Sequence, residues 1–120
     1  MLNEFVVTVH EVGLPQGSRF QVDRLIAEAT YPQIYGGYCR HPDDLFFPAE
    51  EIDTFIDLHA SKLNVAGNSN FFLTERVGGI YVVHVHILGG FCEVHEEEIS
   101  SSSRVWRPEL DHRIVVPKIN

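Results

Sequence analysis

The sequence has few residues that would crosslink or anchor the chain, so its stability must come from a hydrophobic core. Its 120 residues include only two cysteines, Cys39 and Cys92, which lie far apart and form no CxxC motif. Such usage excludes a disulfide-rich miniprotein and is typical of a reducing compartment. No apolar run approaches the roughly 18 residues of a membrane helix. We therefore expect a cytoplasmic protein that does not bind membranes.

Basic residues are also scarce. Nine Lys and Arg face seventeen Asp and Glu, which gives a net charge of -8. Because nucleic-acid binding relies on basic surfaces that neutralise phosphates, we expect no nucleic-acid partner. The sequence also lacks the GxSxG, P-loop and GxGxxG motifs of common hydrolases and nucleotide-binding proteins. With 44% hydrophobic and 22% charged residues, the chain has the composition of one globular domain over residues 1–120.

The hydrophobic pattern predicts an α+β domain in which an antiparallel β-meander of about four to six strands packs with two helices. Alternation predicts a strand over residues 4–9. Helical spacing predicts one helix over residues 19–30, ended by Pro32. A second helix is expected from Pro48 to Gly67, because acidic residues crowd its first turn and apolar residues form one stripe.

The segment between these helices, residues 31–47, is rich in aromatic side chains. One interpretation is an aromatic lid or the rim of a ligand pocket, and the other is a short edge strand whose rings cap the core. For the first interpretation, Tyr35 and Tyr38 are candidate small-molecule ligand residues, together with Phe71 and Leu73 of the following strand.

The second half of the sequence is rich in β-branched and aromatic residues and predicts consecutive antiparallel strands. The first three strands are separated by Gly78-Gly79 and Gly89-Gly90, and paired glycines suit the positive-φ turns of tight hairpins. Two shorter strands follow, each bordered by proline. The predicted strands cover residues 70–77, 80–88, 91–98, 104–107 and 113–116.

Tight turns in these hairpins bring four polar side chains to one face of the sheet. With each Gly-Gly pair forming a two-residue turn, His84 lies opposite Leu73 on one side and His95 on the other. His86 then lies opposite Glu93, and opposite Cβ atoms are about 5 Å apart. The other face of these strands is expected to be the core side.

Three imidazoles and a carboxylate at this spacing are a candidate metal site. His84, His86, Glu93 and His95 are the predicted ligands of a single divalent ion, Zn or Fe/Mn. Neutral imidazoles with one carboxylate and an open position are used by catalytic zinc and non-haem iron, which points to hydrolase or oxygenase activity. Alternatively, these residues are ordinary cross-strand partners or part of a subunit interface.

The residues VVHVHILGG at 82–90 resemble the motif of the histidine-triad nucleotide-binding family, with alternating histidines followed by two apolar residues and Gly-Gly. The resemblance covers roughly residues 49–90 and implies chemistry at a nucleotide α-phosphate. It makes His84 the nucleophile and His86 the third histidine, with Val82 where the family has its first. The same HxH, followed by Glu93 and His95, also resembles the cupin pattern.

A different feature lies near the end of the sequence, where Trp106 stands between Arg104 and Arg107. Trp and Arg are enriched in binding hot spots, so these residues are candidate contacts for a protein partner or a second subunit. Alternatively, Trp106 anchors the last strands to the core. Taken together, the sequence predicts a small binding or interaction protein of unassigned ligand that forms homo-oligomers, with the metal site as the alternative.

Overall fold

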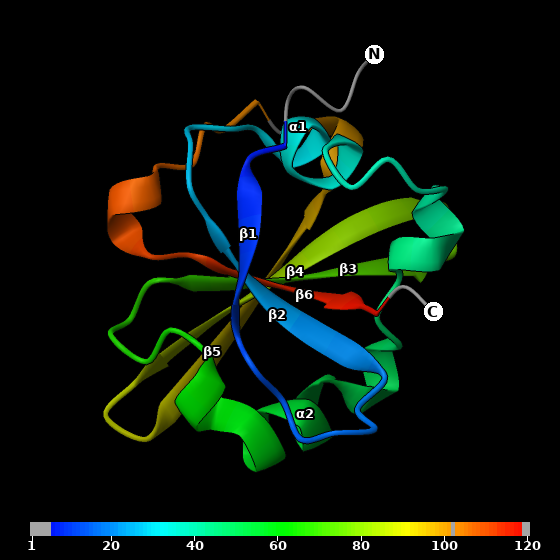
Figure 1. The fold of residues 1–120 in the computed structure, drawn as a ribbon. Helices are drawn as coiled ribbons and strands as arrows, with labels where there is room; N and C mark the ends of the chain where they lie inside the picture. The colour runs from blue at the N-terminus through cyan, green and yellow to red at the C-terminus, as the bar shows by residue number, and fades with distance from the viewer. Residues whose placement is uncertain (1–5, 102, 119–120) are drawn as a thin grey trace.

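The computed structural model describes residues 6–101 and 103–118. They form an α+β fold built on a mostly antiparallel, six-stranded sheet with strand order β1-β2-β6-β3-β4-β5 (Figure 1). The predicted fold class is confirmed, although the sheet is not a simple meander, because β6 lies between β2 and β3 and is parallel to β3. The strands are β1 Thr8–Val12, β2 Phe20–Leu25, β3 Ser69–Arg76, β4 Gly79–Leu88, β5 Phe91–Glu98 and β6 Arg113–Pro117, and the α-helices are α1 Tyr31–Gly36 and α2 Ile52–His59.

The first strand begins later than predicted, at Thr8, and residues 4 and 5 of the prediction lie outside the described residues. The helix predicted over 19–30 is wrong, because β2 occupies half of that segment and no helix lies in it. β2 lies between β1 and β6 and buries side chains on both faces, including Val22 and Leu25. A strand covered on both faces loses its strict alternation, so its apolar spacing resembles that of a helix.

Residues 31–47 contain a helix, α1, in place of the predicted loop or edge strand. Thr30 caps its N-terminus in a capping box with Gln33, and Pro32 lies in its first turn. Proline is compatible with a helix start, since the first N–H groups have no partner inside the helix. Pro32 therefore begins a helix here, whereas the sequence pattern placed it after the end of one.

The second predicted helix is confirmed. It is α2, flanked by short 3-10 turns at Ala49–Glu51 and Ala60–Lys62, and it buries Ile52, Phe55 and Ile56. None of the helices in the described residues is long and apolar enough to cross a lipid bilayer.

The three central predicted strands are also confirmed, but the turn of the first hairpin differs. Val77 and Gly78 form the turn, and Gly79 already pairs with Arg76. As a result Phe71, and not Leu73, lies opposite His84. The register moves by two residues, and an even shift leaves each side chain on its predicted face.

The second hairpin has the predicted register, with His84 opposite His95 and His86 opposite Glu93. Of the two later strands, the one over 113–116 is confirmed as β6. The strand predicted over 104–107 is wrong, because Trp106 forms only an isolated bridge with Ala29.

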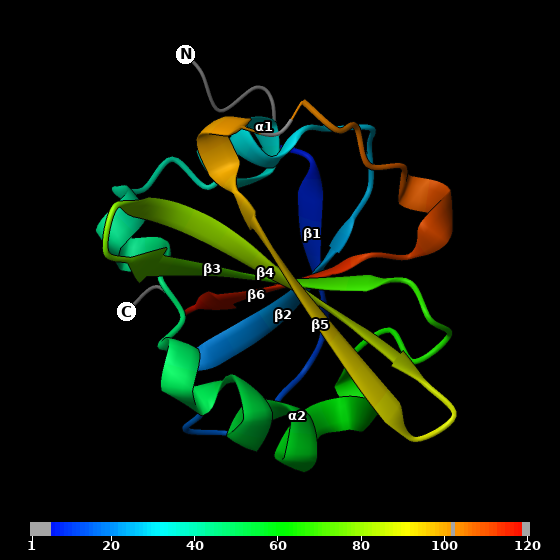
Figure 2. The same ribbon diagram turned by 180° about the vertical axis from the view of Figure 1, so that it is seen from behind.

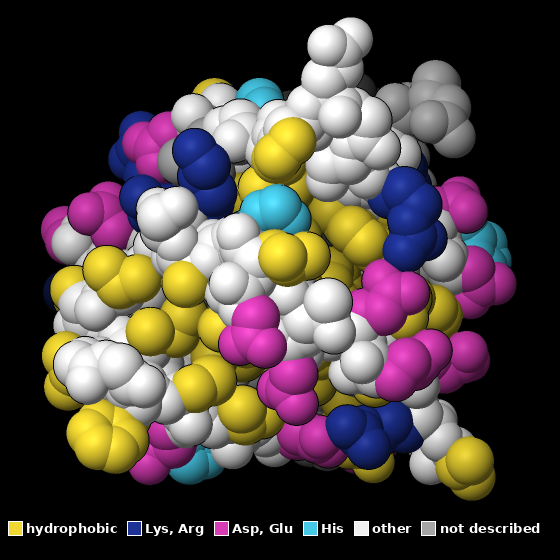
Figure 3. Space-filling model, turned by 90° about the horizontal axis from the view of Figure 1, so that it is seen from below, with side chains coloured by type: hydrophobic (Ala, Val, Ile, Leu, Met, Phe, Trp, Pro, Cys, Tyr) yellow, Lys and Arg dark blue, Asp and Glu magenta, His cyan; other side chains and the backbone are white. Residues whose placement is uncertain are grey.

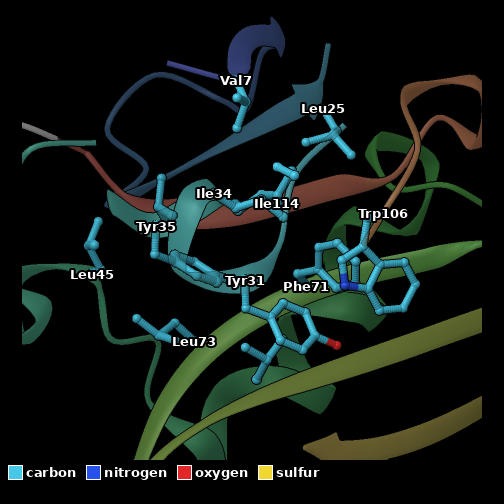
Figure 4. Close-up of a cluster of buried hydrophobic side chains, with 13 residues drawn as sticks. Val7, Leu25, Tyr31, Ile34, Tyr35, Leu45, Phe71, Leu73, Trp106 and Ile114 are labelled. Atoms are coloured by element: carbon cyan, nitrogen blue, oxygen red, sulfur yellow. The ribbon is translucent and has the colours of Figure 1, made fainter. Parts of the chain in front are cut away.

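Both faces of the sheet are core faces, one covered by α1 and the other by α2 (Figures 1 and 2). The expectation of a single core face is therefore wrong: Phe71 and Phe72, neighbours on β3, are both fully buried on opposite sides. On the α1 side, which we call the α1 core, the rings of Tyr31, Phe71 and Trp106 lie together (Figure 4). On the α2 side, the α2 core includes Phe20, Phe47, Phe55, Phe72, Val83 and Val85.

Candidate functional site

A hollow of about 350 Å3 opens over β4 and β5 on the α1 side of the sheet, where the α1 core ends. We call it the histidine hollow. Its position follows from the sheet, since β4 and β5 extend past the part that α1 covers and β5 is exposed along most of its length. The hollow is lined by His84, His86, His95, Glu96, Glu97 and Arg104.

Three imidazoles form a nearly equilateral triangle around this hollow. The ring centres of His84 and His86 are 5.5 Å apart, and the ring centre of His95 is 5.6 Å from each of the other two. Cross-strand pairing places His84 beside His95, and the period of two along β4 places His86 on the same face. The predicted gathering of these three histidines is therefore confirmed.

His84 is the most buried of the three, at 6% exposure, and its Nδ1 has no hydrogen-bond partner. Its Nε2 lies 3.7 Å from Oε1 of Glu97. Burial lowers the pKa of His84 to about 4, with further lowering by His86, Arg104 and His95 and an opposing effect of Glu97. The ring is therefore neutral near pH 7 and has one N–H donor and one acceptor nitrogen.

Glu97 connects the hollow to the α1 core. The hydroxyl of Tyr31 donates a hydrogen bond to its Oε1 over 2.8 Å. Burial, together with this bond to Glu97, raises the pKa of Tyr31 well above its usual range, so the phenol keeps its proton and remains a donor. Tyr31 lies 66 positions before Glu97 in the sequence. No local sequence pattern therefore connects Tyr31 with the residues of the histidine hollow.

The other two imidazoles already have partners on one ring nitrogen each. His86 Nδ1 lies 3.0 Å from the carbonyl oxygen of Gly67, which can only accept, so Nδ1 carries the proton and Nε2 is an acceptor when the ring is neutral. His95 Nε2 lies 3.2 Å from Oε1 of Glu93.

The predicted metal ligands are thus adjacent, but their donor atoms do not converge. His84 Nε2 is directed to Glu97, whereas His95 Nε2 is directed to Glu93. As the side chains stand, no three His, Cys, Asp or Glu residues within 6–101 and 103–118 could hold a metal ion. A metal site at His84, His86, Glu93 and His95 remains a prediction.

The predicted interaction residues separate into a buried and an exposed group. Trp106 is 7% exposed and packs against Phe71, with ring centres 4.8 Å apart. Trp106 is therefore not exposed, as a partner contact would require, and its packing agrees with the anchoring interpretation; an interaction role of Arg104 and Arg107 stays a prediction. The guanidinium of Arg104 lies 4.8 Å from the centre of the Trp106 ring, at the hollow, while the exposed Arg107 lies 3.9 Å from Glu28.

The predicted small-molecule residues lie mostly in the core. Tyr35, Phe71 and Leu73 are buried, and the hydroxyl of Tyr38 donates to the carboxylate of Asp23. Tyr35 and Leu73 border a cavity of about 190 Å3, and neither Phe71 nor Tyr38 is among its lining residues. These four residues therefore do not form one pocket, because the bulky rings pack inside the α1 core.

Comparison with known proteins assigns no family to the chain. No protein-family model, no curated protein and no solved structure matches it. The resemblances to the histidine-triad and cupin patterns therefore rest on the sequence patterns within residues 49–95 alone. What the histidine hollow binds has to be inferred from its own geometry.

Proposed function

We propose that the protein binds a small polar molecule in the histidine hollow, and that this ligand carries both an ammonium group and an anionic group such as a carboxylate. The observation that carries the proposal is the composition of the hollow. Neutral imidazole and carboxylate acceptors meet a guanidinium within one opening. A ligand with one charge of each sign is complementary to both sides of this opening.

The acceptor side of the hollow is formed by Nε2 of His86 and the carboxylate of Glu97, next to the uncharged ring of His84. His84 is uncharged near pH 7, and in a neutral ring Nε2 of His86 is an acceptor because Nδ1 is bonded to a carbonyl. Glu97 is held by the hydroxyl of Tyr31, so its carboxylate has a fixed position. An ammonium group has three N–H donors and no acceptor, and therefore fits this side.

The opposite charge is supplied by Arg104, whose guanidinium lies over Trp106. Guanidinium groups bind carboxylates and phosphates through paired hydrogen bonds. The volume of the hollow, about 350 Å3, is at the lower end of the range for small-molecule sites. These two properties favour a compact ligand with closely spaced charges.

A divalent transition-metal ion is a second candidate, favoured by the spacing of the rings. An ion bound to one nitrogen of each of three imidazoles at 2.0–2.1 Å places the ring centres roughly 5 Å apart. The observed separations are 5.5 and 5.6 Å. Metal binding additionally requires the His95 ring, whose side chain is 51% exposed, to turn away from Glu93.

The test is a titration of isotope-labelled protein followed by the imidazole and backbone signals in NMR spectra. Four probes separate the chemistries: alanine, propylamine, propionate and zinc chloride. We expect alanine to shift the signals of the histidine hollow at lower concentration than propylamine or propionate. Glu97→Gln and Arg104→Gln should each weaken alanine binding at least tenfold. The control His59→Gln, on α2 against Phe55, should leave it unchanged.

The outcomes decide between the candidates. Saturation at one equivalent of zinc, lost in His95→Gln and with no response to alanine, would replace the first candidate with the metal site. A response to propylamine or propionate that equals the response to alanine would contradict a ligand of mixed charge. No response of the hollow to any of the four probes would overturn the assignment of the hollow as a binding site.

A further inference from the structure

The two edges of the sheet differ in how they are protected. β1 is short, and its pairing with β2 is interrupted by an irregularity between His10 and Val12. β5 is eight residues long, and all eight pair with β4 in an unbroken register. Bulges, prolines and charged side chains are the usual features that prevent a sheet edge from accepting another strand. β5 has no bulge and no proline, and its acidic charges repel an acidic strand but not a basic one. β5 is therefore the edge that remains open to pairing.

The register identifies the backbone groups that point outward. Gly89 and Gly90 both have positive φ and form a two-residue turn, so the flanking Leu88 and Phe91 are a hydrogen-bonded pair. Hydrogen-bonded and non-bonded pairs alternate along an antiparallel ladder. It follows that Cys92, Val94 and Glu96 direct their N–H and C=O groups away from β4.

No strand in the described residues pairs with this outer side of β5, which forms the front edge of the sheet in Figure 2. Both faces of the strand are open near the turn, where Phe91 is 82% exposed and Val94 is 47% exposed. An incoming strand would therefore gain backbone hydrogen bonds and contact with two apolar side chains.

The charge around this edge is strongly negative. The sequence of β5, FCEVHEEE, contains four glutamates and no Lys or Arg. On the α2 side, Asp53 and Asp57 are close enough to add to the effect of burial in raising the pKa of the Cys92 thiol. The nearby cation Arg76 is engaged with Glu96. Figure 3, seen from the side where α2 lies, shows acidic side chains next to exposed apolar ones.

From this edge we propose that β5 binds an extended, basic segment of another protein as a seventh strand of the sheet. Alternating Lys or Arg side chains of the partner would lie on the same face as Glu93 and Glu97, and the apolar side chains between them would lie on the other face and cover Val94. A second copy of this chain is the wrong partner, because pairing β5 with β5 places glutamates of both strands together and like charges repel. This proposal does not depend on the ligand of the histidine hollow.

The experiment uses a synthetic peptide, acetyl-Lys-Val-Lys-Val-Lys-Val-Lys-amide, titrated into the whole isotope-labelled protein. We expect saturable shifts of the backbone amide signals of Cys92, Val94 and Glu96, and weaker binding as salt is added. The matching peptide with Glu in place of Lys should not bind. The variant Val94→Pro removes one outward N–H without removing a bond to β4, and should weaken binding at least tenfold.

Two controls separate loss of the outward N–H from loss of the Val94 side chain and from unfolding of β5. Val94→Ala retains the outward N–H and should bind within about twofold of the unchanged protein. The imidazole signals of His84 and His95 report whether the β4–β5 pairing survives in Val94→Pro. Equal binding by intact Val94→Pro, or shifts confined to α2, would overturn the proposal. If instead the free protein forms dimers through β5 as its concentration rises, the partner is a second copy and the basic segment is the wrong occupant.

Discussion

Burial of His84 among other imidazoles makes the stability of the protein depend on pH. The pKa of His84 is about 4 in the folded protein and 6.5 when the ring is exposed. Between these values the unfolded chain binds a proton that the folded protein does not. The free energy of unfolding should therefore be highest above pH 6.5 and fall as the pH decreases towards 4, by a total on the order of 2–3 kcal/mol from this group.

Urea unfolding at several pH values between 7 and 4 measures this effect, with His84→Gln as the comparison. The slope should be smaller in the variant. Part of the pH dependence of the free energy of unfolding should remain in His84→Gln, because burial also lowers the pKa of His112. An NMR titration of wild-type protein that gives His84 a midpoint near 6.5 would show that the ring is not desolvated as described.

The hydroxyls of Tyr31 and Tyr35 differ in a way that two conservative substitutions can measure. The Tyr31 hydroxyl donates to Glu97, whereas the Tyr35 hydroxyl is buried without a hydrogen-bond partner among the described residues. Tyr31→Phe should lower the free energy of unfolding by about 1.5–3 kcal/mol, because the acceptor is a carboxylate. Tyr35→Phe should leave it unchanged or raise it, since an unsatisfied buried hydroxyl is lost. Urea unfolding at pH 7 tests both, and an equal loss in the two variants would contradict the pairing.

Among individual residues, the sequence predicted that the histidines and Glu93 lie together, but it did not predict the contacts of Tyr31 and Arg104. His84 and His95 follow from strand alternation and a short turn, which are local properties. Tyr31 and Arg104 reach the same place through α1 and the segment before Trp106, and only tertiary packing brings them there. A cross-sheet contact of this kind leaves no periodic signal in the sequence.

The position of the turn between β3 and β4 can be tested with two glycine substitutions. Gly78 has a φ of +98°, and a Cβ there meets nothing within 4 Å, so Gly78→Ala adds only backbone strain. We expect Gly78→Ala to lower the free energy of unfolding by about 1–2 kcal/mol. Gly79 is not in the positive-φ region, and the one short contact of a Cβ there, 2.9 Å, is with Oε2 of the flexible Glu98 side chain, so Gly79→Ala should lower the free energy of unfolding by less.

Denaturant midpoints of the two alanine variants, measured side by side, decide the position of the turn. If Gly79→Ala were the more damaging substitution, the turn would lie at Gly78-Gly79, as the glycine pair predicted. The same comparison would then restore Leu73 as the partner of His84.

The elements that were predicted correctly are those with one uncovered face or a clear boundary. α2 has a single apolar stripe, and β3, β4 and β5 are separated by turns. β2 was mistaken for a helix because β1 and β6 cover its edges and both cores cover its faces. α1 was missed because six residues are too few to show a period.

Considered as a whole, the molecule has two cores that share one sheet. Phe71 and Phe72 lie on opposite faces of β3, one in each core. Because the two cores share these strands, a substitution that destabilises one core should destabilise the other to the same extent. Ile56→Val, in the α2 core, should lower the free energy of unfolding by about 0.5–1.5 kcal/mol. Fluorescence of Trp106, in the α1 core, should report the same midpoint shift in urea as far-UV circular dichroism. Separate midpoints would mean that the two cores unfold independently.

The position of β6 has a consequence for the order in which the protein is made. β6 pairs with β2 on one side and with β3 on the other, yet of the six strands in this sheet it is the one that is synthesised after the other five. Until residues 113–117 emerge, the β1–β2 hairpin and the β3–β4–β5 unit have no strand between them. The nascent chain therefore carries two partial sheets with apolar, unpaired edges. If translation pauses at that point, these edges are exposed for longer and the nascent chain depends most on a chaperone.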